Sequence, residues 1–562
     1  MPKVWIDSIT FNDSTKLKLE TNDIIVFVGP NNAGKSASLK EINRLSTSTS
    51  DKGKVISSLS VGSEGSETEL VTLLGSIGQK QITSNPFPTY HGYEFQIYEA
   101  NATSYWSNAH TSGLGELSKI FIKNITTEGR LQAANPTNNI RLSQEPPRHP
   151  IHFLQKKDSL EYKFSDYFRQ AFGKDLIVHR NAGNEVPLYV GERPTPIEGE
   201  DRVSEGYLSK LEALDLLHEQ GDGMRSFVGV LLESFVSNHS ILLIDEPEAF
   251  LHPPQARLLG QMLAKDLPSE RQLFLATHSG DFLKGVLDSK VKNLKIVRIR
   301  REGALNRVST LNSSDISEIW NDSLLRHSNI LDGLFHSKVV VCESDSDCKF
   351  YSAVLAAICE QRKIPTPDIL FIHCGGKHRM PTVIKSLRKL DVPLQIITDF
   401  DILNSPDPLR SIVASLNGEW EEMETDWKTV KASVDQKRPE LETIDVKREI
   451  TNILDNVSER IFQSRAAREI NSVLKKASAW AQAKSIGKSF IPSGNAQQSF
   501  DRLQEKLQNL GLLVVEVGEL EGFVRSIGNH GPKWVNEVLE KDLANDRELE
   551  DARRFIEKLL TN

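Results

Sequence analysis

The first segment that could do chemistry is glycine-rich and reads GPNNAGKS at residues 29–36. It has the G-x-x-x-x-G-K-[ST] spacing of a phosphate-binding loop, in which backbone N–H groups surround a β-phosphate and the lysine reaches the β- and γ-phosphates. An apolar run at 24–28 precedes the loop and a segment of helical composition follows it, which is the order that the motif requires and that a chance glycine turn would not explain. The loop predicts that ATP and Mg²⁺ bind at Asn31, Asn32, Gly34, Lys35 and Ser36.

Two acids follow a second apolar run, ILLIDE at 241–246. Asp245 is placed to hold Mg²⁺ through water, and Glu246 to polarise the attacking water. His278 comes directly after a third apolar run, 273–276, where a histidine can sense the γ-phosphate. Taken alone, the acids could form a plain β-turn and the histidine could be structural. Beside a phosphate-binding loop, a hydrolytic site is the better interpretation.

A separate group of carboxylates follows two apolar runs in the C-terminal half, VVVCESDSD at 339–347 and IITDFD at 396–401. Parallel strands deliver such residues to one edge of a sheet, and alternate residues of an extended D-x-D point to the same side. The predicted ligands Glu343, Asp399 and Asp401 are oxygen donors of the kind that Mg²⁺ or Mn²⁺ prefers. Two such ions can clamp a phosphodiester. The alternative is that these acids are solvated turn residues.

A basic run, GKHRMPTVIKSLRK at 376–389, lies between these two acidic segments. Its position suits contacts with phosphates along a nucleic acid backbone. It could equally be a solvated helix face, and the sequence leaves both interpretations open.

Composition limits the class of protein. The chain has 562 residues, 38% hydrophobic and 26% charged, which predicts a multidomain globular protein of three or four folding units. No apolar run reaches the roughly 20 residues of a membrane span, and the N-terminus has no signal-peptide pattern, so we expect a cytoplasmic protein. The net charge of −8 argues against a general polyanion binder, although a nuclease needs only a local basic surface. The four cysteines show no zinc-site spacing, and Cys342 and Cys374 lie in or beside apolar runs typical of burial.

The alternation of helices and apolar strands predicts an α/β fold with parallel sheets. In the first half we expect a helix at 211–236, strands at 241–244 and 273–276, and closing strands at 293–311. A helical connector at about 314–335 leads to a second series, with strands near 339–342, 369–373, 394–398 and 512–517. The predicted domains are 1–335, with an inserted subdomain at about 140–206 that is a candidate for dimerisation, and 336–562, with a helical insertion at about 405–508. The polar tract 46–139 gives little chemical signal.

The N-terminal motifs resemble the ABC-type P-loop ATPase heads of the RecF and SMC type. The segment EPEAFLHP at 246–253 is similar to their E-P-E-x-x-L-H-P form, and His278 matches their switch histidine. The segment QGDGMRS at 220–226 resembles their signature loop, although it departs from L-S-G-G-Q. The resemblance implies that Gly221 and Gly223 complete the ATP site of a second copy, and therefore that the chain forms a homodimer or a higher homo-oligomer.

The C-terminal acids resemble those of a TOPRIM domain, with Glu343 as acid/base glutamate, Asp399 and Asp401 as metal ligands, and CGGK at 374–377 as the glycine turn. An ABC-type head followed by TOPRIM resembles the OLD (overcoming lysogenisation defect) nucleases, which include the nuclease subunit of the Gabija defence system and effectors of some retrons. The resemblance implies three further site residues, namely Asp347 as a metal ligand, Glu521 as a late acid with Glu519 as its rival, and Lys533 as the lysine that supports the transition state. Ser344 replaces the family's usual glycine, which puts the tightness of that turn in doubt.

These features predict an ATP-binding and ATP-hydrolysing, Mg²⁺- or Mn²⁺-dependent DNA endonuclease that acts in anti-phage defence. Its partners would be DNA, further copies of the chain, and a defence-system protein, either a helicase or a reverse transcriptase with its nucleic acid. The alternative is an ATP-switched DNA-binding or repair scaffold with an inactive TOPRIM site. A topoisomerase is disfavoured because after residue 337 the only tyrosine is Tyr351, on a predicted helix. A primase-like polymerase lacks a recognisable zinc module.

Overall fold

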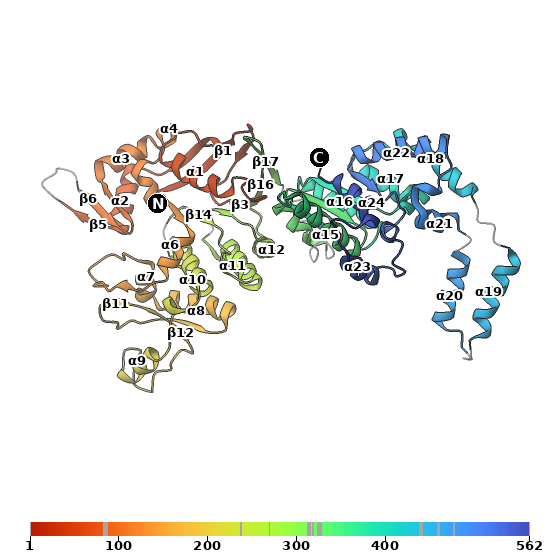
Figure 1. The fold of residues 1–562 in the computed structure, drawn as a ribbon. Helices are drawn as coiled ribbons and strands as arrows, with labels where there is room; N and C mark the ends of the chain where they lie inside the picture. Colours follow the sequence, from red (N-terminus) through yellow and green to blue (C-terminus); the bar gives the residue numbers. More distant parts are fainter. Residues whose placement is uncertain are drawn as a thin grey trace. The chain divides into compact units, whose positions relative to one another are not determined.

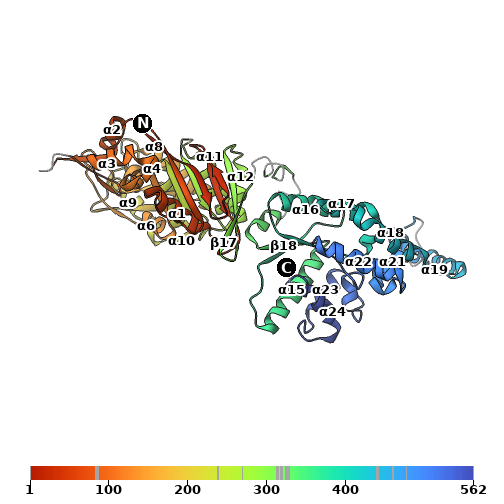
Figure 2. The same cartoon turned by 90° about the horizontal axis from the view of Figure 1, so that it is seen from above.

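The structure is a computed structural model, and it divides into two compact units, Met1–Ser323 and Leu324–Asn562 (Figures 1 and 2). It describes residues 2–82, 88–236, 239–268, 270–311, 316, 320–322, 329–437, 442–457, 461–475 and 478–560. Much of the predicted connector at 314–335 lies outside these residues; its last part is a 3-10 helix, η3 (Asn329–Phe335). Among the helices described here, none combines the length and the apolar character that a membrane crossing requires.

A six-stranded sheet forms the centre of the first unit, in the order β17-β16-β3-β15-β14-β8. The neighbours from β16 to β8 run parallel, and β17 closes the sheet as an antiparallel hairpin with β16. Every residue of β3 is buried, as expected for a parallel strand covered on both faces. The strands are β3 (Ile24–Val28), β8 (Ile122–Ile125), β14 (Ile241–Asp245), β15 (Gln272–Ala276), β16 (Leu294–Glu302) and β17 (Leu305–Leu311).

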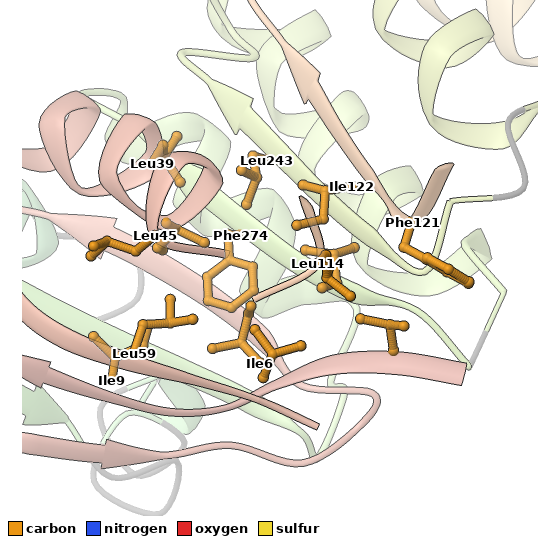
Figure 3. Close-up of a cluster of buried hydrophobic side chains, with 14 of the residues drawn as sticks. Ile6, Ile9, Leu39, Leu45, Leu59, Leu114, Phe121, Ile122, Leu243 and Phe274 are labelled. Atoms are coloured by element: carbon orange, nitrogen blue, oxygen red, sulfur yellow. The ribbon is translucent and has the colours of Figure 1, made fainter. Parts of the chain in front are cut away.

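A three-stranded antiparallel sheet, β2-β1-β4, contributes to the same core. Figure 3 shows Ile6, Ile9 and Leu59 from this sheet gathered near Phe274 of β15. Leu39 and Leu45 of helix α1 belong to the same buried cluster. The same cluster includes residues of β3, so the core joins the strand before the phosphate-binding loop to the helix after it. The elements are β1 (Lys3–Phe11), β2 (Lys16–Lys18), α1 (Lys35–Thr47) and β4 (Ile56–Glu64).

The polar tract at 46–139 supplies part of the central sheet, which its composition did not reveal. It contains the edge strand β8, and helix α6 after it. Its other elements are α2 (Glu67–Ile77), β5 (Gly78–Gln81), β6 (Thr89–Gly92), β7 (Phe95–Tyr98), α3 (Glu99–Ser107), α4 (Ala109–Ser112), η1 (Gly115–Leu117), α5 (Ser118–Phe121), α6 (Thr127–Ala133) and β9 (Thr137–Asn138).

The segment that follows, to about residue 220, has its own small antiparallel sheet, β10-β12-β13. The buried carboxylate of Glu161 holds this segment together. Arg180, Arg193 and Arg202 each place a guanidinium nitrogen within 2.8 Å of that carboxylate. The elements are α7 (Pro150–Lys156), α8 (Asp158–Phe172), β10 (Asp175–Val178), β11 (Glu185–Val186), β12 (Leu188–Gly191), α9 (Glu205–Glu212), β13 (Asp215–Leu216) and η2 (Leu217–Glu219).

The single helix expected at 211–236 was wrong. Helix α9 ends at Glu212, and α10 (Asp222–Phe235) begins ten residues later. Between them Asp215 and Leu216 pair with β12, so strand pairing interrupts the apolar periodicity that suggested one helix. Helix α11 (Pro253–Asp266) and helix α12 (Gly280–Asp288) follow β14 and β15, respectively.

A four-stranded parallel sheet, β19-β18-β20-β21, forms the centre of the second unit. One face is covered by a cluster that includes Val340 and Cys342 of β18, Phe350 of α15, Trp534 of α23 and Phe555 of α24. The strands β18 (Lys338–Cys342), β19 (Ile369–His373) and β20 (Leu394–Thr398) lie where the apolar runs predicted them, and β21 (Leu512–Val514) is shorter than expected. The helices are α15 (Asp345–Arg362), α16 (Met380–Lys389), α23 (Pro532–Leu539) and α24 (Glu550–Glu557), with η7 (Arg547–Leu549) before the last.

Helices fill the chain between β20 and β21. Helix α18 packs against α22, and α19 lies beside α20 (Figure 1). Helix α19 has no buried residue, whereas α21 buries Trp480 and Ala483. The elements are η4 (Phe400–Asn404), α17 (Pro406–Ser415), α18 (Glu421–Gln436), α19 (Thr443–Asp455), α20 (Ser464–Lys475), α21 (Ala479–Ile486), η5 (Gly487–Phe490) and α22 (Asn495–Asn509).

Candidate functional site

The phosphate-binding loop connects β3 to α1. Gly29 and Gly34 adopt φ angles of 143° and 109°, which side chains other than glycine rarely allow. A Cβ atom at Gly29 would lie 2.0 Å from the carbonyl oxygen of Ile299, so the loop also needs glycine for its close approach to β16. Nζ of Lys35 donates hydrogen bonds of 2.7 and 2.8 Å to the carbonyl oxygens of Gly29 and Pro30. The lysine therefore lies across the loop in which phosphates would bind.

The strand order β3-β15-β14 brings three predicted segments to one sheet edge, namely the phosphate-binding loop, the acids after β14 and the histidine after β15. Oγ of Ser36 donates a 2.9 Å hydrogen bond to Oδ1 of Asp245, so the two predicted Mg²⁺ ligands are in contact. Nε2 of His278 lies 3.2 Å from Oε1 of Glu246. Burial raises the pKa of Asp245, and burial lowers the pKa of His278, with Lys35 adding to that second effect. These shifts favour a neutral histidine beside the glutamate.

Two further residues support this edge. Oε1 of Glu248 accepts hydrogen bonds from Oγ1 of Thr277 at 2.7 Å and from the backbone N–H of His278 at 2.9 Å. Arg130 of α6 is fully buried and donates a 3.0 Å hydrogen bond to the backbone carbonyl of Asp245. Glu248 stands in the quoted EPE segment, but nothing local in the sequence marks Arg130, which lies more than a hundred residues from its partner.

The signature-like segment begins helix α10. Gly221 is its N-cap, with φ −59°, and no atom of the described residues lies within 4 Å of a Cβ built there. A Cβ at Gly223 would lie 2.8 Å from the carbonyl oxygen of Phe250. The contact of Gly221 and Gly223 with ATP would require a second copy of the chain and stays a prediction.

The C-terminal acids converge at the ends of β18 and β20. The backbone N–H of Asp399 donates a 3.1 Å hydrogen bond to Oε1 of Glu343. Glu343, Asp399 and Asp401 each offer a carboxylate oxygen, and these oxygens all lie within 4.8 Å of one another. The extended conformation predicted for the D-x-D pair is wrong. Asp399 is the N-cap of η4, and Asp401 lies inside that 3-10 turn. The turn brings the two aspartates together.

Two lysines enter this acidic cluster. Nζ of Lys484, on α21, lies 2.9 Å from Oδ2 of Asp399, 3.6 Å from Oδ2 of Asp401 and 3.8 Å from Oε2 of Glu519. Nζ of Lys377 donates a 3.0 Å hydrogen bond to Oδ2 of Asp401, which ties the start of the basic run to the acids. Sequence reasoning missed Lys484, because the helical insertion that carries it has no motif.

The remaining predicted acids lie around the same edge. Asp347 closes a capping box with Ser344 at the start of α15, and its Oδ2 accepts a 2.8 Å hydrogen bond from the Ser344 backbone. Glu519, Glu521 and His530 form a second group with ligand atoms within 4.8 Å of one another. Burial raises the pKa of Asp347 to about 6, and the charges of Asp399 and Glu521 add to it. Glu519 and Glu521 therefore both belong to the acidic edge.

Lys533 occupies an exposed position on α23. For the residues with described positions, no ion pair joins Lys533 to an acid, whereas Lys377 and Lys484 both make such pairs. The role of Lys533 stays a prediction.

The acidic edge fits a divalent cation. Burial raises the pKa of Glu343 to about 7, and the charges of Asp399 and Asp401 add to this effect. Oδ1 of Asp401 is a buried oxygen that has no hydrogen-bond partner among the described residues. Carboxylates crowded in this way are stabilised by a hard cation, and an unpartnered oxygen is a free ligand position.

Comparison with known proteins separates the chain into two matched regions. Residues 24–283 match the family model "AAA domain, putative AbiEii toxin, Type IV TA system", and residues 334–401 match "Overcoming lysogenization defect protein-like, TOPRIM domain". The two models cover the phosphate-binding loop and the first acids of the C-terminal cluster, respectively.

Comparison with individual proteins gives less information about this chain than the family models do. Uncharacterized protein MJECL11 of Methanocaldococcus jannaschii is 32% identical over 97 residues, which are 16% of this chain and 84% of that protein. Over that stretch the chain belongs to the same family as MJECL11, whose name states no activity.

Among solved structures, an SMC head bound to the C-terminal winged-helix domain of ScpA is 11% identical with a TM-score of 0.34, over 56% of this chain and all of that one. An SMC head with an extended coiled coil, bound to the C-terminal domain of ScpA from Pyrococcus furiosus, is 10% identical with a TM-score of 0.31, over 57% of this chain and 99% of that one. TM-scores this low support no argument about function.

The family matches and the site geometry agree on the same two regions. The fold is α/β, with an N-terminal P-loop ATPase domain and a C-terminal TOPRIM domain. The chain thus has the architecture of the OLD family, an ATPase domain followed by an OLD-like TOPRIM domain.

Proposed function

We propose that this protein is an ATP-hydrolysing, divalent-metal-dependent DNA endonuclease. The observation that carries the proposal is the convergence of Glu343, Asp399 and Asp401 at the ends of β18 and β20, in a chain that also has a phosphate-binding loop. An OLD-like TOPRIM match over the same residues supports nuclease chemistry.

The residues that would hold divalent ions are Glu343, Asp347, Asp399, Asp401 and Glu521, with Glu519 beside them. Mg²⁺ or Mn²⁺ bound there would supply Lewis acidity toward a phosphodiester. Glu343 is the candidate acid/base group, because its carboxylate lies among the proposed metal ligands and the main chain of Asp399 holds it in place. The ammonium group of Lys377 lies at this edge, where it bonds to Asp401, and can pair with a phosphate oxygen of DNA.

In the ATPase domain, Asn31, Asn32, Gly34 and Lys35 would bind the phosphates, and Ser36 with Asp245 would hold Mg²⁺. Glu246 is the candidate base for the attacking water, with His278 held 3.2 Å from it. Gly221 and Gly223 would act on the ATP of a second copy, so a homodimer or higher homo-oligomer is part of the proposal.

A scaffold that switches with ATP and binds DNA without cutting it is the second candidate. Two observations favour it, and the first is that Lys484 pairs with Asp399 and Asp401 and so neutralises part of the charge of the acidic cluster. Ser344, in place of the glycine usual in OLD nucleases, points the same way.

A plasmid assay separates the two candidates. Supercoiled plasmid is incubated with the purified chain in Mg²⁺ or Mn²⁺, with and without ATP, and with EDTA as the blank. The nuclease nicks or linearises plasmid only when a divalent ion is present, and ATP changes the rate. If the plasmid stays intact under every nucleotide condition while the protein still binds ATP, the nuclease proposal is contradicted and the scaffold is the remaining candidate.

The biological setting we propose is anti-phage defence in the cytoplasm, with a helicase or a reverse transcriptase and its nucleic acid as partner. Its test is phage challenge of cells that carry the gene with Glu343 intact or replaced. A nuclease effector loses protection in Glu343→Ala, whereas a scaffold keeps it.

A further inference from the structure

The position of Lys484 is set by the main chain around it. Gly487, at the end of α21, and Gly518, before Glu519, have φ angles of 72° and 112°. A Cβ atom at Gly518 would lie 2.0 Å from the carbonyl oxygen of Lys484, and one at Gly487 would lie 2.0 Å from that of Glu516. The backbone N–H of Lys488 also donates a 2.7 Å hydrogen bond to the carbonyl of Glu516. The end of α21 is therefore in direct backbone contact with the loop that leads to the late acids.

This contact brings a cation from the helical insertion to acids from the sheet. The ammonium of Lys484 is within 4 Å of Asp399, Asp401 and Glu519, at the distances given above. Its side chain is 32% exposed, so the pairs are only partly screened by solvent. An isolated surface ion pair does not require two close backbone contacts that only glycine allows, such as those at Gly487 and Gly518.

Lys484 contacts two of the three carboxylates whose oxygens could hold a divalent ion, those of Asp399 and Asp401. Oδ2 of Asp399 and Oδ2 of Asp401 both face its Nζ atom. A divalent cation bound to these two carboxylates would repel an ammonium group that stays beside them, because like charges at such short distances interact unfavourably.

We propose that Lys484 is an exchangeable counter-cation, which holds Asp399 and Asp401 together in the metal-free protein and leaves their oxygens when a divalent ion binds. This inference rests on the proposed metal site. It makes Lys484 a positioning residue that keeps the empty site assembled and weakens its affinity for the ion. A lysine with a purely structural role would instead support metal binding.

The test compares Lys484→Met with Lys488→Met. Lys488 is a matched control, since it is also 32% exposed and pairs with acids outside the cluster, Asp501 at 2.8 Å and Glu516 at 3.9 Å. Mn²⁺ affinity is measured by calorimetry on the full chain without nucleotide, and Tm is measured in EDTA and in Mn²⁺. Glu343→Gln serves as the blank for Mn²⁺ bound elsewhere.

Lys484→Met should bind Mn²⁺ about tenfold more tightly than wild type, have a lower Tm in EDTA and gain more Tm from Mn²⁺. Lys488→Met should keep wild-type Mn²⁺ affinity. Unchanged or weaker Mn²⁺ binding by Lys484→Met, with wild-type binding intact, overturns this inference and leaves the proposed nuclease standing. Absence of Mn²⁺ binding in wild type overturns both.

Lys484→Gln is the second variant, because it keeps a hydrogen-bond donor for Asp399 but has no charge. It must show the same tightening of Mn²⁺ binding. Wild-type affinity in Lys484→Gln would mean that charge is not the property that matters, and would overturn the inference even if Lys484→Met did not fold.

Discussion

The backbone N–H of Asp399 donates a hydrogen bond of 3.1 Å to Oε1 of Glu343. This bond joins the residues that directly follow two adjacent parallel strands, β20 and β18. The main chain orients the glutamate, so its direction does not depend on the side chain at 399. A substitution of Glu343 that keeps an acceptor at the same atom should therefore leave the fold intact.

Glu343→Gln should lower metal-dependent DNA cleavage by about 10² to 10⁴, the range typical of a lost general acid or base. The glutamine oxygen can still accept from Asp399, but it has no charge and cannot take a proton at neutral pH. Plasmid cleavage with Mg²⁺ and Mn²⁺ measures the loss, and Tm confirms folding.

Asp345→Asn is the control for Glu343→Gln. Asp345 is two residues away, its side chain is 60% exposed, and it pairs only with Lys349 at 2.7 Å among the ion pairs of the described residues. Cleavage by this variant should match wild type. Equal losses in both variants would show that the acid at 343 has no special role.

The pH dependence of Mn²⁺ binding follows from Glu343 and Asp347. Burial, with the charge of Asp399, raises the pKa of Glu343 to about 7 and that of Asp347 to about 6. A divalent ion binds the deprotonated forms, so Mn²⁺ affinity should rise from about pH 5.5 to about pH 8. Calorimetry across this range measures the rise, and a flat profile would contradict the assigned ligands.

The stability of the metal-free protein should change in the opposite direction. The folded chain keeps the Glu343 proton up to about pH 7, whereas the unfolded chain releases it near the ordinary value of 4.5. The stabilisation from this group is complete below the unfolded pKa and is lost as pH rises through the folded one. In EDTA, the Tm of Glu343→Gln relative to wild type should therefore increase between about pH 5 and about pH 8. A constant difference would contradict the raised pKa.

Gly518→Ala should destabilise the TOPRIM unit by about 1–3 kcal/mol, the usual cost of a strained backbone position. Its φ of 112° disfavours any side chain, and the new Cβ would lie 2.0 Å from the carbonyl of Lys484. At about 2–4 °C of Tm for each kcal/mol in a unit of this size, thermal denaturation resolves the effect. Gly528→Ala is the control, since within the part of the chain that the structure describes no atom lies within 4 Å of its Cβ position. Equal Tm values for the two variants would contradict the close approach.

Local signals in the sequence were enough to place the strands that precede the sites. The apolar runs at 24–28, 241–244, 339–342 and 394–398 are short, are bounded by turn residues or acids, and are buried in the structure except for the half-buried Leu394. Because parallel strands end at a common edge, the convergence of Glu343 with Asp399 could be predicted without coordinates.

Residues that reach a site from a distant element could not be predicted in this way. Arg130 contacts the carbonyl of Asp245 only because β8 lies beside β14, a pairing that no local pattern encodes. Lys484 reaches Asp399 because two glycines allow α21 to touch the loop before Glu519. Both residues look like ordinary helix residues in the sequence, and only tertiary packing gives them their contacts.

Glu246→Gln should lower the rate of ATP hydrolysis by a factor of about 10² or more, while the protein still binds ATP. Glu246 contacts His278 and lies beyond the end of β14, whereas Lys35 and Ser36 of the phosphate-binding loop are unchanged by the substitution. Phosphate release measures hydrolysis, and a fluorescent ATP analogue measures binding. Asp281→Asn is the control, because its side chain is 41% exposed against 42% for Glu246 and pairs with Lys284 instead. If Glu246→Gln hydrolyses ATP at the wild-type rate, another residue must act as the base.

ATP should convert the Glu246→Gln protein from a monomer to a dimer, because slow hydrolysis preserves an ATP that two copies would share. Gly221→Glu added to this variant should prevent the dimer without loss of ATP binding. At Gly221 the φ of −59° suits any residue, and among the residues with described positions no atom lies within 4 Å of the Cβ position, so the glutamate should not disturb its own protomer. It would place a negative charge against the phosphates held by the other copy.

Light scattering after size exclusion, with and without ATP, measures the change of mass in both proteins. Gly183→Glu is the control, since its Cβ position is equally open and it lies outside the signature-like segment. The control should dimerise with ATP as the parent does. A dimer that persists in Gly221→Glu would mean that the segment at 220–226 does not meet the nucleotide of a second copy, and that the ATP site is completed by other residues.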